Sequence, residues 1–345
     1  MNLQAAIVFV LATFLSACST LRFYSQALNG QTEMMSKARP VAEVLKDPKT
    51  KPILKECLLS VAHILRYAED ELRLPAEGQY SRYADLGRRY AVWVVFAAPE
   101  FSVEPKTWNY PLIGQLAYRG FFQEALAKAE AKHLNAEGYD VHIGGVEAYS
   151  TLGFLRDPLL NTFIHRDDAA LAELLFHELT HQRLYLRGDT DFNEAFATAV
   201  GQEGARRWLR SQGRLKELAE YEKGLRVERA FVALALQTRE ELKRCYATKT
   251  DLKETKKAIL EHFRQRAVAL DRKQGSTMKI ERWFAKPVNN ARLATLSTYY
   301  ELLPGFEALL TQNGGDLEKF FKEVEAMKHL PHRVRTQRIR SRGQL

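Results

Sequence analysis

The sequence has few cysteines and no long apolar run beyond its first residues. Only three of its 345 residues are cysteine, so the chain can form no more than one disulfide. The apolar run from Ala5 to Leu15 is too short to span a bilayer, and no later stretch is long and apolar enough to be a membrane helix. Apolar residues make up 46% of the chain, as is normal for a soluble globular protein. We therefore expect a sizeable core, in one large domain or two closely packed halves.

A recognisable nucleic-acid-binding module is also missing. The formal net charge is +9, but the basic residues are dispersed through segments with helical patterns, except for a basic tail from His332 to Arg342. Without a module this charge does not indicate a nucleic-acid partner. It fits solvated helix faces and a basic tail, or an attraction to anionic lipid headgroups.

Lysine and arginine are absent from the first four residues, where a signal peptide usually carries them. The apolar run nevertheless ends in Leu15-Ser16-Ala17-Cys18, which is the pattern of a lipoprotein signal over residues 1–17. Lipid on Cys18 would anchor the mature chain without spanning the membrane. Ser19 follows the cysteine, as in lipoproteins sent to the outer membrane. We expect an outer-membrane lipoprotein facing the periplasm; an ordinary secretory signal or a short buried helix is the alternative.

The two remaining cysteines are Cys57 and Cys245. In an oxidising compartment they form a candidate disulfide that would close a very long loop. Two buried free thiols are the alternative. Neither cysteine has the spacing of a zinc ligand.

A candidate metal site lies near the middle of the chain, in His177-Glu178-Leu179-Thr180-His181. Two histidines four residues apart lie on one face of a helix, so both imidazoles can reach one metal ion. Glu178 projects beside the metal, where a carboxylate can take a proton from water. Glu194 supplies a third ligand and leaves a fourth position open. The pattern indicates a zinc hydrolase, with zinc as the cofactor.

The surrounding sequence favours two helices around this motif. A broad apolar stripe predicts a helix over 168–186, with acidic residues at its start. A second helix is expected from about Asp191, with Glu194 in its first turn. A short turn between them can bring Glu194 back toward the histidines. Asn193 and Asp191 are candidates to hold the histidine rings. The simpler reading is an amphipathic helix whose histidines bind nothing.

The rest of the chain predicts a mostly helical α+β fold. Strands are expected over 90–97, 139–146 and 161–165, and helices over 53–74 and 116–134. After the metal helices the pattern is long, charged and helical. We expect residues 18–345 to form the mature domain, with helices and a small mixed sheet over 18–166 and the metal helices and a helical lobe over 167–345. A cleft would lie between sheet and helices.

These residues resemble the gluzincin metallopeptidases, whose third ligand is a glutamate on a following helix. They resemble more closely a family of bacterial zinc aminopeptidases that are often lipoproteins. The resemblance covers most of the mature chain, and the stretches that carry it are 148–154, 157–160, the histidine motif, 192–197 and 289–293. The resemblance implies a zincin-like fold, a zinc site at His177, His181 and Glu194, and peptide hydrolysis.

Substrate contacts are expected from two segments. The strand before a zincin's metal helix commonly pairs with the substrate, and the candidates here are Gly145, Glu147 and Tyr149. This segment resembles an aminopeptidase strand in which the glutamate holds the free amine of the substrate, which assigns that role to Glu147. After the third ligand, Asn290 is a second candidate for substrate binding and Tyr299 for stabilising the developing oxyanion.

The sequence thus predicts a zinc-dependent peptidase, in which Glu178 activates water and then protonates the leaving amine. We expect an aminopeptidase that acts on peptides as a monomer. An endopeptidase of the cell envelope is the alternative within the same class. A metal-bearing scaffold lipoprotein without catalysis is the alternative from another class.

Overall fold

The computed structural model describes residues 22–110, 114–151, 156–275 and 280–343. Cys18 and the expected signal peptide lie outside the described residues. Within the described ranges, no helix combines the length and the apolar character needed to cross a membrane. The structure is mostly helical with a small mixed sheet, which confirms the α+β class.

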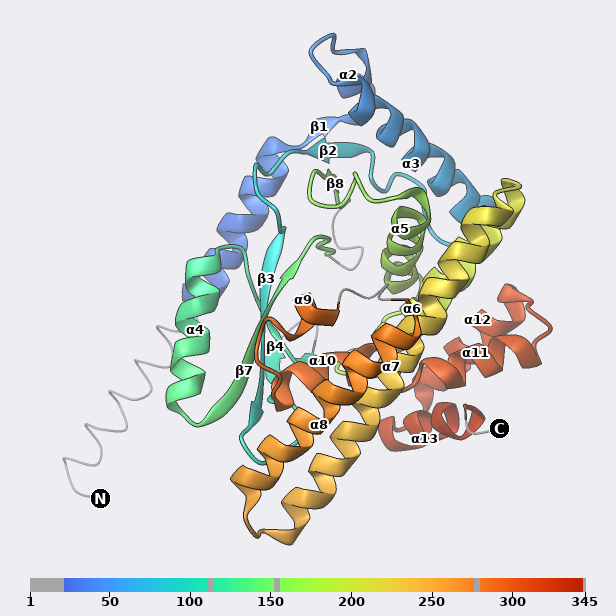
Figure 1. Cartoon of the computed structure of the whole chain (residues 1–345). Helices are drawn as coiled ribbons and strands as arrows, with labels where there is room; N and C mark the ends of the chain where they lie inside the picture. Colours follow the sequence, from blue (N-terminus) through green and yellow to red (C-terminus); the bar gives the residue numbers. More distant parts are fainter. Residues whose placement is uncertain (1–21, 111–113, 152–155, 276–279, 344–345) are drawn as a thin grey trace.

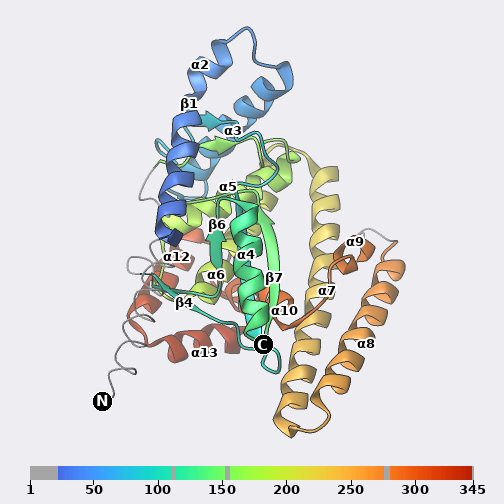
Figure 2. The ribbon, with the colours of Figure 1, turned by 90° about the vertical axis from the view of Figure 1, so that its left-hand side faces the viewer.

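A three-stranded antiparallel sheet stands at the centre of the N-terminal half (Figure 1). Its middle strand is β3 (Val92–Pro99), which is almost completely buried because its run of β-branched and aromatic residues packs on both faces. Strand β7 (Tyr139–Val146) pairs with β3 along its whole length, and β6 (Arg119–Phe121) pairs on the other side. Helix α4 (Glu124–Ala136) covers one face of this sheet, as Figure 2 shows.

Two smaller sheets flank the central one. The first has the strand order β1-β2-β8, with one antiparallel and one parallel pair, and the second is a two-stranded antiparallel hairpin. Their strands are β1 (Arg39–Pro40), β2 (Arg82–Ala84) and β8 (Leu159–Leu160), then β4 (Trp108–Tyr110) and β5 (Gly114–Leu116).

Helices make up the remainder of the chain (Figure 1). Helix α3 begins with Pro52, which suits a first helical position because its missing N–H would have no partner there. Helices α7 and α8 form a long hairpin that projects from the body in both views (Figures 1 and 2). In chain order these helices are one over residues 22–37, then α2 (Val41–Lys46), α3 (Pro52–Asp70), α5 (Asp168–Arg183), α6 (Thr190–Ser211), α7 (Leu215–Thr248), α8 (Leu252–Lys273), α9 (Ile280–Phe284), α10 (Asn290–Tyr300), α11 (Leu303–Gln312), α12 (Leu317–Ala326) and α13 (His332–Arg342), with a 3₁₀ turn at Met327–His329.

The largest hydrophobic core draws residues from both sides of the expected boundary at residue 166. It includes Phe176 of α5, Phe196 of α6 and Phe306 of α11, which are all fully buried. A second core joins the α7–α8 hairpin to α9 and α10, and a third lies between α4 and the central sheet. Helices α5 and α6 are therefore held in the centre of the molecule.

Two predicted elements are wrong. The segment 116–134 is not one helix: residues up to Phe121 form β5 and β6, and helix α4 starts only at Glu124. Arg119, Gly120 and Phe121 pair with β3, so pairing with a distant strand overrides the local helical pattern. The strand expected over 161–165 is a turn, and the strand there is the two-residue β8.

The candidate disulfide is not formed, because Cys57 and Cys245 are both free thiols. Cys57 lies on α3, where its sulfur is 3.7 Å from Nδ1 of His165. Cys245 is buried near the end of α7. Helix α3 lies in the upper part of Figures 1 and 2, whereas the end of α7 that carries Cys245 lies at the bottom.

Candidate metal centre

Helices α5 and α6 carry the three residues of the candidate metal site. The side chain of Asp167 caps α5 by accepting the N–H of Ala170 at 2.9 Å. Asp189 caps α6 in the same way from the N–H of Phe192. The short connection at 184–189 reverses the chain, so the first turn of α6 returns to the face of α5 that carries the histidines.

Asn193 holds this connection in place. Its side-chain amide bonds both the N–H and the C=O of Leu186, each at 2.8 Å. The next residue along α6 is Glu194, so the hydrogen bonds of Asn193 fix the position of the backbone that carries the Glu194 side chain. Asn193 was expected to hold a histidine ring, and the structure corrects that prediction. Asp191 is likewise engaged elsewhere, by Thr298 of α10.

Two glycines on α6 allow the helices to approach closely. A Cβ on Gly201 would lie 2.9 Å from the carbonyl oxygen of Glu173 on α5. A Cβ on Gly204 would lie 2.6 Å from the ring of Phe176. Both distances are shorter than real Cβ contacts, so larger residues would push α6 away from the histidines.

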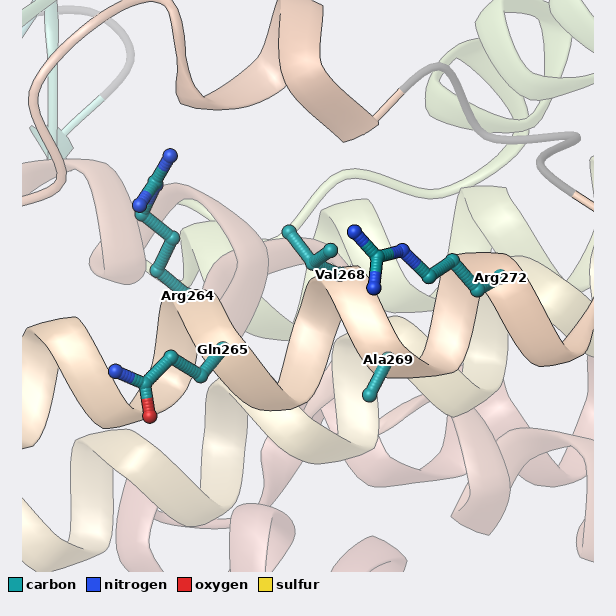
Figure 3. A pocket seen from close by; sticks show the side chains of 5 residues that line it. All are labelled: Arg264, Gln265, Val268, Ala269 and Arg272. Atoms are coloured by element: carbon teal, nitrogen blue, oxygen red, sulfur yellow. The ribbon is translucent and has the colours of Figure 1, made fainter.

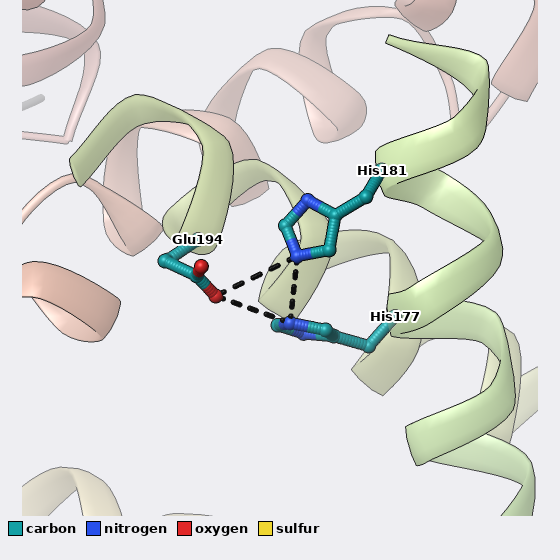
Figure 4. A group of neighbouring side chains, drawn as sticks. All are labelled: His177, His181 and Glu194. Atoms are coloured by element: carbon teal, nitrogen blue, oxygen red, sulfur yellow. Dashed lines mark hydrogen bonds and ion pairs between the residues drawn. The ribbon is translucent and has the colours of Figure 1, made fainter. Parts of the chain in front are cut away.

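The three ligand atoms converge on one position, as Figure 4 shows. Nε2 of His177 lies 3.2 Å from Nε2 of His181 and 3.2 Å from Oε2 of Glu194, and the third edge, between His181 and Glu194, is 3.6 Å. A tetrahedral zinc ion with bonds of about 2.0–2.1 Å separates its ligand atoms by about 3.3 Å. The triangle therefore fits zinc without rearrangement.

The donor set also suits a cation. Two ring nitrogens and a carboxylate oxygen point at one place, and these are atom types that bind zinc. Burial alone would raise the pKa of Glu194, but the two histidines outweigh it and hold the pKa well below the usual value. Glu194 is therefore ionised, as a ligand must be.

Glu178 lies next to this triangle and lines the same cavity. Burial raises the pKa of Glu178 above the usual value, and the carboxylates of Glu194 and Asp157 act in the same direction. Glu178 is not one of the three residues whose ligand atoms converge, but it lines the cavity beside them.

A cavity of about 340 Å³ opens beside the triangle. Its walls come from the helix at residues 22–37, from β3, from the segment around β4 to β6, from residues 146–150 and from α5, α6 and α10. His177, Glu178, His181 and Glu194 form its polar end. The cleft expected between the sheet and the helices is therefore present.

Tyr299 of α10 lines the same cavity as the two histidines and Glu194. Its ring stacks on His177, with centroids 6.3 Å apart and an angle of 26° between the rings. The charge of Glu194, together with burial, raises the pKa of Tyr299 well above its usual value. The hydroxyl therefore keeps its proton and can donate a hydrogen bond into the cavity.

The other expected substrate residues divide into two groups. Tyr149 lines the cavity and meets the ring of Phe122 edge-on at 5.0 Å. Glu147 does not line it: Nε and Nη2 of Arg166 donate to its carboxylate at 2.9 and 2.7 Å. Gly145 faces the opposite side of the sheet, where a Cβ would lie 2.4 Å from the ring of Tyr90.

Asn290 has a structural role that its sequence context did not indicate. It is buried, and its side-chain nitrogen donates to the carbonyls of Pro99 and Glu100 at 3.1 and 2.9 Å. Its side-chain oxygen accepts the hydroxyl of Tyr246. These bonds tie α10 to the end of β3, so Asn290 is corrected from a substrate contact to a support for the helix that carries Tyr299.

Two tyrosines near the site were missed in the sequence. Tyr118 and Tyr185 both line the cavity close to Glu194. Tyr185 is four residues after His181 but lies in the connection beyond the end of α5 at Arg183, so helical periodicity does not account for its place in the cavity. Tyr118 lies between two short strands, where no local signal marks it.

Other hollows on the surface lack such chemistry. The one in Figure 3 is formed by five side chains of α8 alone, among them Arg264 and Arg272. Another is lined by His142, Lys286 and Arg292 beside β7. Neither contains a cluster of metal-ligating side chains among the described residues, where the single such cluster is His177, His181 and Glu194.

No curated protein and no solved structure matches the chain. A family model described as "Putative aminopeptidase" matches residues 22–339, a range that includes the metal helices, the cavity walls and α10. Because this match extends over nearly the whole chain, the protein belongs to the family described as "Putative aminopeptidase".

Proposed function

We propose that this protein is a zinc-dependent peptidase. The observation that carries the proposal is the convergence of His177, His181 and Glu194 on one position, with Glu178 beside it at the polar end of a cavity. Membership of a family described as aminopeptidases supports peptide hydrolysis. The pairing of a metal helix with a glutamate-bearing helix next to a sheet supports a zincin-like fold of the gluzincin type.

His177, His181 and Glu194 would hold the zinc ion. Bound there, zinc supplies Lewis-acid chemistry, which polarises a carbonyl and makes water more acidic. Three protein ligands beside a cavity are typical of catalytic rather than structural zinc sites.

Glu178 acts as the general base. Its carboxylate accepts the proton of the attacking water and then delivers that proton to the nitrogen of the leaving amine. A positioned carboxylate in this role contributes about 10²- to 10⁴-fold to the rate. Its place on α5, fixed one residue from a ligand, keeps the carboxylate oriented before the substrate arrives.

Tyr299 stabilises the developing oxyanion. As water attacks, negative charge grows on the carbonyl oxygen of the scissile amide, and a donor aimed at that oxygen lowers the barrier. Tyr299 lines the cavity with its ring stacked on His177, and its raised pKa keeps the hydroxyl protonated. Asn290 anchors the start of the same helix, which keeps this donor in register.

The family description favours an aminopeptidase, but one observation supports an endopeptidase as a second candidate. An aminopeptidase needs an acid that faces the free amine of its substrate. Glu147 was the expected acid, and Arg166 already neutralises it outside the cavity. A peptide with a blocked N-terminus would then fit as well as a free one.

We also propose that the chain is a lipoprotein anchored at Cys18 in the outer membrane and facing the periplasm. The motif at residues 15–18 supports this location. The residues that line the cavity begin at Phe23, so an anchor at Cys18 would hold the active site close to the membrane surface.

The test measures zinc content and cleavage of a peptide library by the wild type and by Glu178→Gln. We expect one zinc per chain in both, with cleavage lowered at least about 10²-fold in the variant. Exposed Glu220 provides the matched control, Glu220→Gln, which should keep full activity. Glu194→Gln should lose zinc. Equal cleavage by the wild type and Glu178→Gln, or none by either with zinc bound, would overturn the proposal. Libraries with free and acetylated N-termini separate the two peptidase types.

A further inference from the structure

Away from its polar end, the cavity is lined by apolar and aromatic side chains. Strand β3 contributes Val92, Val94 and Phe96 from one face, and Phe122 and Tyr149 continue the surface. These residues come from segments far apart in the sequence. Burial of a ligand's apolar groups against such a surface favours binding, by about 25 cal/mol per Å² of apolar area removed from water.

The charged side chains of the cavity are confined to its polar end. Among the described lining residues, the only carboxylates are Glu178 and Glu194, and there is no lysine, arginine or aspartate. A charged substrate side chain placed against the apolar walls would lose its water and find no partner. The cavity therefore discriminates against charge as well as favouring apolar area.

The outer wall is a helix from the start of the described chain, over residues 22–37. Phe23, Tyr24 and Ala27 lie on the side that lines the cavity. Leu28, the next residue, points away and is 69% exposed. The wall thus has one face toward the cavity and one toward solvent, which provides matched positions for substitution.

This helix is firmly docked. The side chain of Gln26 accepts the N–H of Phe122 at 3.0 Å and donates to the carbonyl of Gly120 at 3.3 Å, as a neighbouring strand would. Gly30 lies directly against Phe122, where a Cβ would come within 2.0 Å of the ring. Arg119 lies 4.2 Å from the ring centre of Phe23. The wall is therefore a fixed boundary of the cavity.

We propose that this cavity is a specificity pocket, which selects peptides with a large apolar or aromatic side chain next to the scissile bond, and that the helix over 22–37 limits the size of that side chain. The proposal rests on the proposed peptidase function for its location beside the zinc ligands. The cavity volume of about 340 Å³ is near the lower end of ligand sites, which range over about 300–1,000 Å³, and suits one large side chain and its neighbouring backbone.

The first experiment measures kcat/KM on peptides that differ only at the residues flanking the cleaved bond, with phenylalanine, leucine, alanine, aspartate or lysine there. We expect phenylalanine and leucine to exceed alanine by about tenfold or more, since each extra methylene in an apolar pocket contributes about 10- to 200-fold. Aspartate and lysine should be the poorest. Equal rates for charged and aromatic peptides would overturn the proposal.

Substitution of the wall gives a second test. Ala27→Trp fills the cavity from the helix and should lower kcat/KM for the phenylalanine peptide by about tenfold or more, with a smaller effect on the alanine peptide. Leu28→Trp adds the same group on the outer face and should change neither. An equal loss on both peptides in Ala27→Trp would show that the wall does not set side-chain size.

A binding measurement separates this proposal from the peptidase proposal. N-acetylated hydroxamates of phenylalanine, alanine and aspartate bind zinc directly and need no cleavage. Calorimetry on the zinc-loaded wild type should show about tenfold tighter binding of the phenylalanine compound than of the other two. If no peptide is cleaved but this preference is found, the peptidase proposal fails and the pocket stands. If cleavage occurs and the hydroxamates bind equally, the pocket proposal fails.

Discussion

Arg335 of the C-terminal helix α13 forms a buried ion pair with Asp189, the residue that caps the glutamate-bearing helix α6. Nε and Nη2 of Arg335 lie 2.8 and 2.5 Å from the same carboxylate oxygen. The side chain of Asp189 is only 2% exposed and that of Arg335 is 8% exposed. The last helix of the chain therefore braces the connection that brings Glu194 to the histidines.

Removing the arginine should weaken both the fold and the metal site. Arg335→Met leaves the buried charge of Asp189 with only the exposed His332, 3.4 Å away, as an ion-pair partner, and removing one partner of a buried pair costs about 3–5 kcal/mol of unfolding free energy. We also expect zinc affinity to fall about tenfold or more, because the start of α6 loses its brace. Urea denaturation and competitive zinc titration measure the two effects. Exposed Arg338 on the same helix gives the control, Arg338→Met, which should change neither.

The double variant Asp189→Asn/Arg335→Met distinguishes the loss of the ion pair from the cost of leaving a buried charge unpaired. Asparagine still caps a helix, and no unpaired charge remains, so this variant should be more stable than Arg335→Met alone. Unchanged zinc affinity in Arg335→Met, despite lower stability, would show that the ion pair supports the fold without positioning Glu194.

Loss of the Tyr299 hydroxyl should affect the chemical step. Tyr299→Phe removes one donor to the developing oxyanion, and we expect kcat to fall by about 10²-fold or more, with little change in KM or zinc content. The neighbouring Tyr300 donates its hydroxyl to Glu228 at 2.8 Å and does not line the cavity. Tyr300→Phe, assayed well below its unfolding temperature, should therefore keep kcat. If Tyr299→Phe instead raises KM and leaves kcat unchanged, Tyr299 is a substrate-binding residue.

The contact between the metal helices can be tested with a pair of glycines. At Gly201 an added methyl group meets the backbone of Glu173, and overpacking of this kind costs about 1–3 kcal/mol. Gly201→Ala should therefore lower the unfolding free energy and the zinc affinity together. Gly224 on α7 has nothing within 4 Å of the same position. Gly224→Ala should raise stability by about 0.5–1 kcal/mol, because alanine favours a helix. Equal effects at both sites would contradict close packing at Gly201.

The environment of Asp168 should make the stability of the fold depend on pH. It accepts hydrogen bonds from Ser60 of α3, from Nε1 of Trp208 at 3.2 Å and from Arg214, with Glu217 also nearby. Burial would raise the pKa of Asp168, but these partners outweigh it and the pKa is lowered. Its contribution to stability is therefore complete above the unfolded pKa of about 3.9 and is lost as the pH falls through the lower folded value.

Asp168→Asn should accordingly lower the unfolding free energy by about 1–2 kcal/mol at pH 7. The difference from the wild type should shrink as the pH falls below about 4, where the wild-type carboxyl also becomes neutral. Urea denaturation at pH 7 and at pH 3 measures both values. Exposed Asp70 offers the control Asp70→Asn, which should be nearly neutral at either pH. A difference that does not change with pH would assign the effect to packing rather than charge.

Local patterns predicted the elements whose structure is set within a few turns of chain. The helix expected over 168–186 and the one from about Asp191 are α5 and α6, with shifted ends. The strand expected over 139–146 has those bounds. The segment 116–134 failed because its first residues join a sheet whose central strand lies more than twenty residues away. Pairing with a strand so far away in the sequence produces no local hydrophobic pattern from which it could be predicted.

The candidate site shows the same division. The amino-acid sequence by itself determined His177, Glu178 and His181 as a set, because helical periodicity places them relative to one another. It also pointed to Glu194, whose distance along the chain suits one short turn between two helices. Only the tertiary structure decided that the carboxylate meets both histidines and that a largely apolar pocket adjoins them. It also decided that Asn290 supports α10 and that Glu147 pairs with Arg166. Those outcomes depend on how separate elements pack, and packing is set by the shapes of side chains far apart in the sequence rather than by any local repeat.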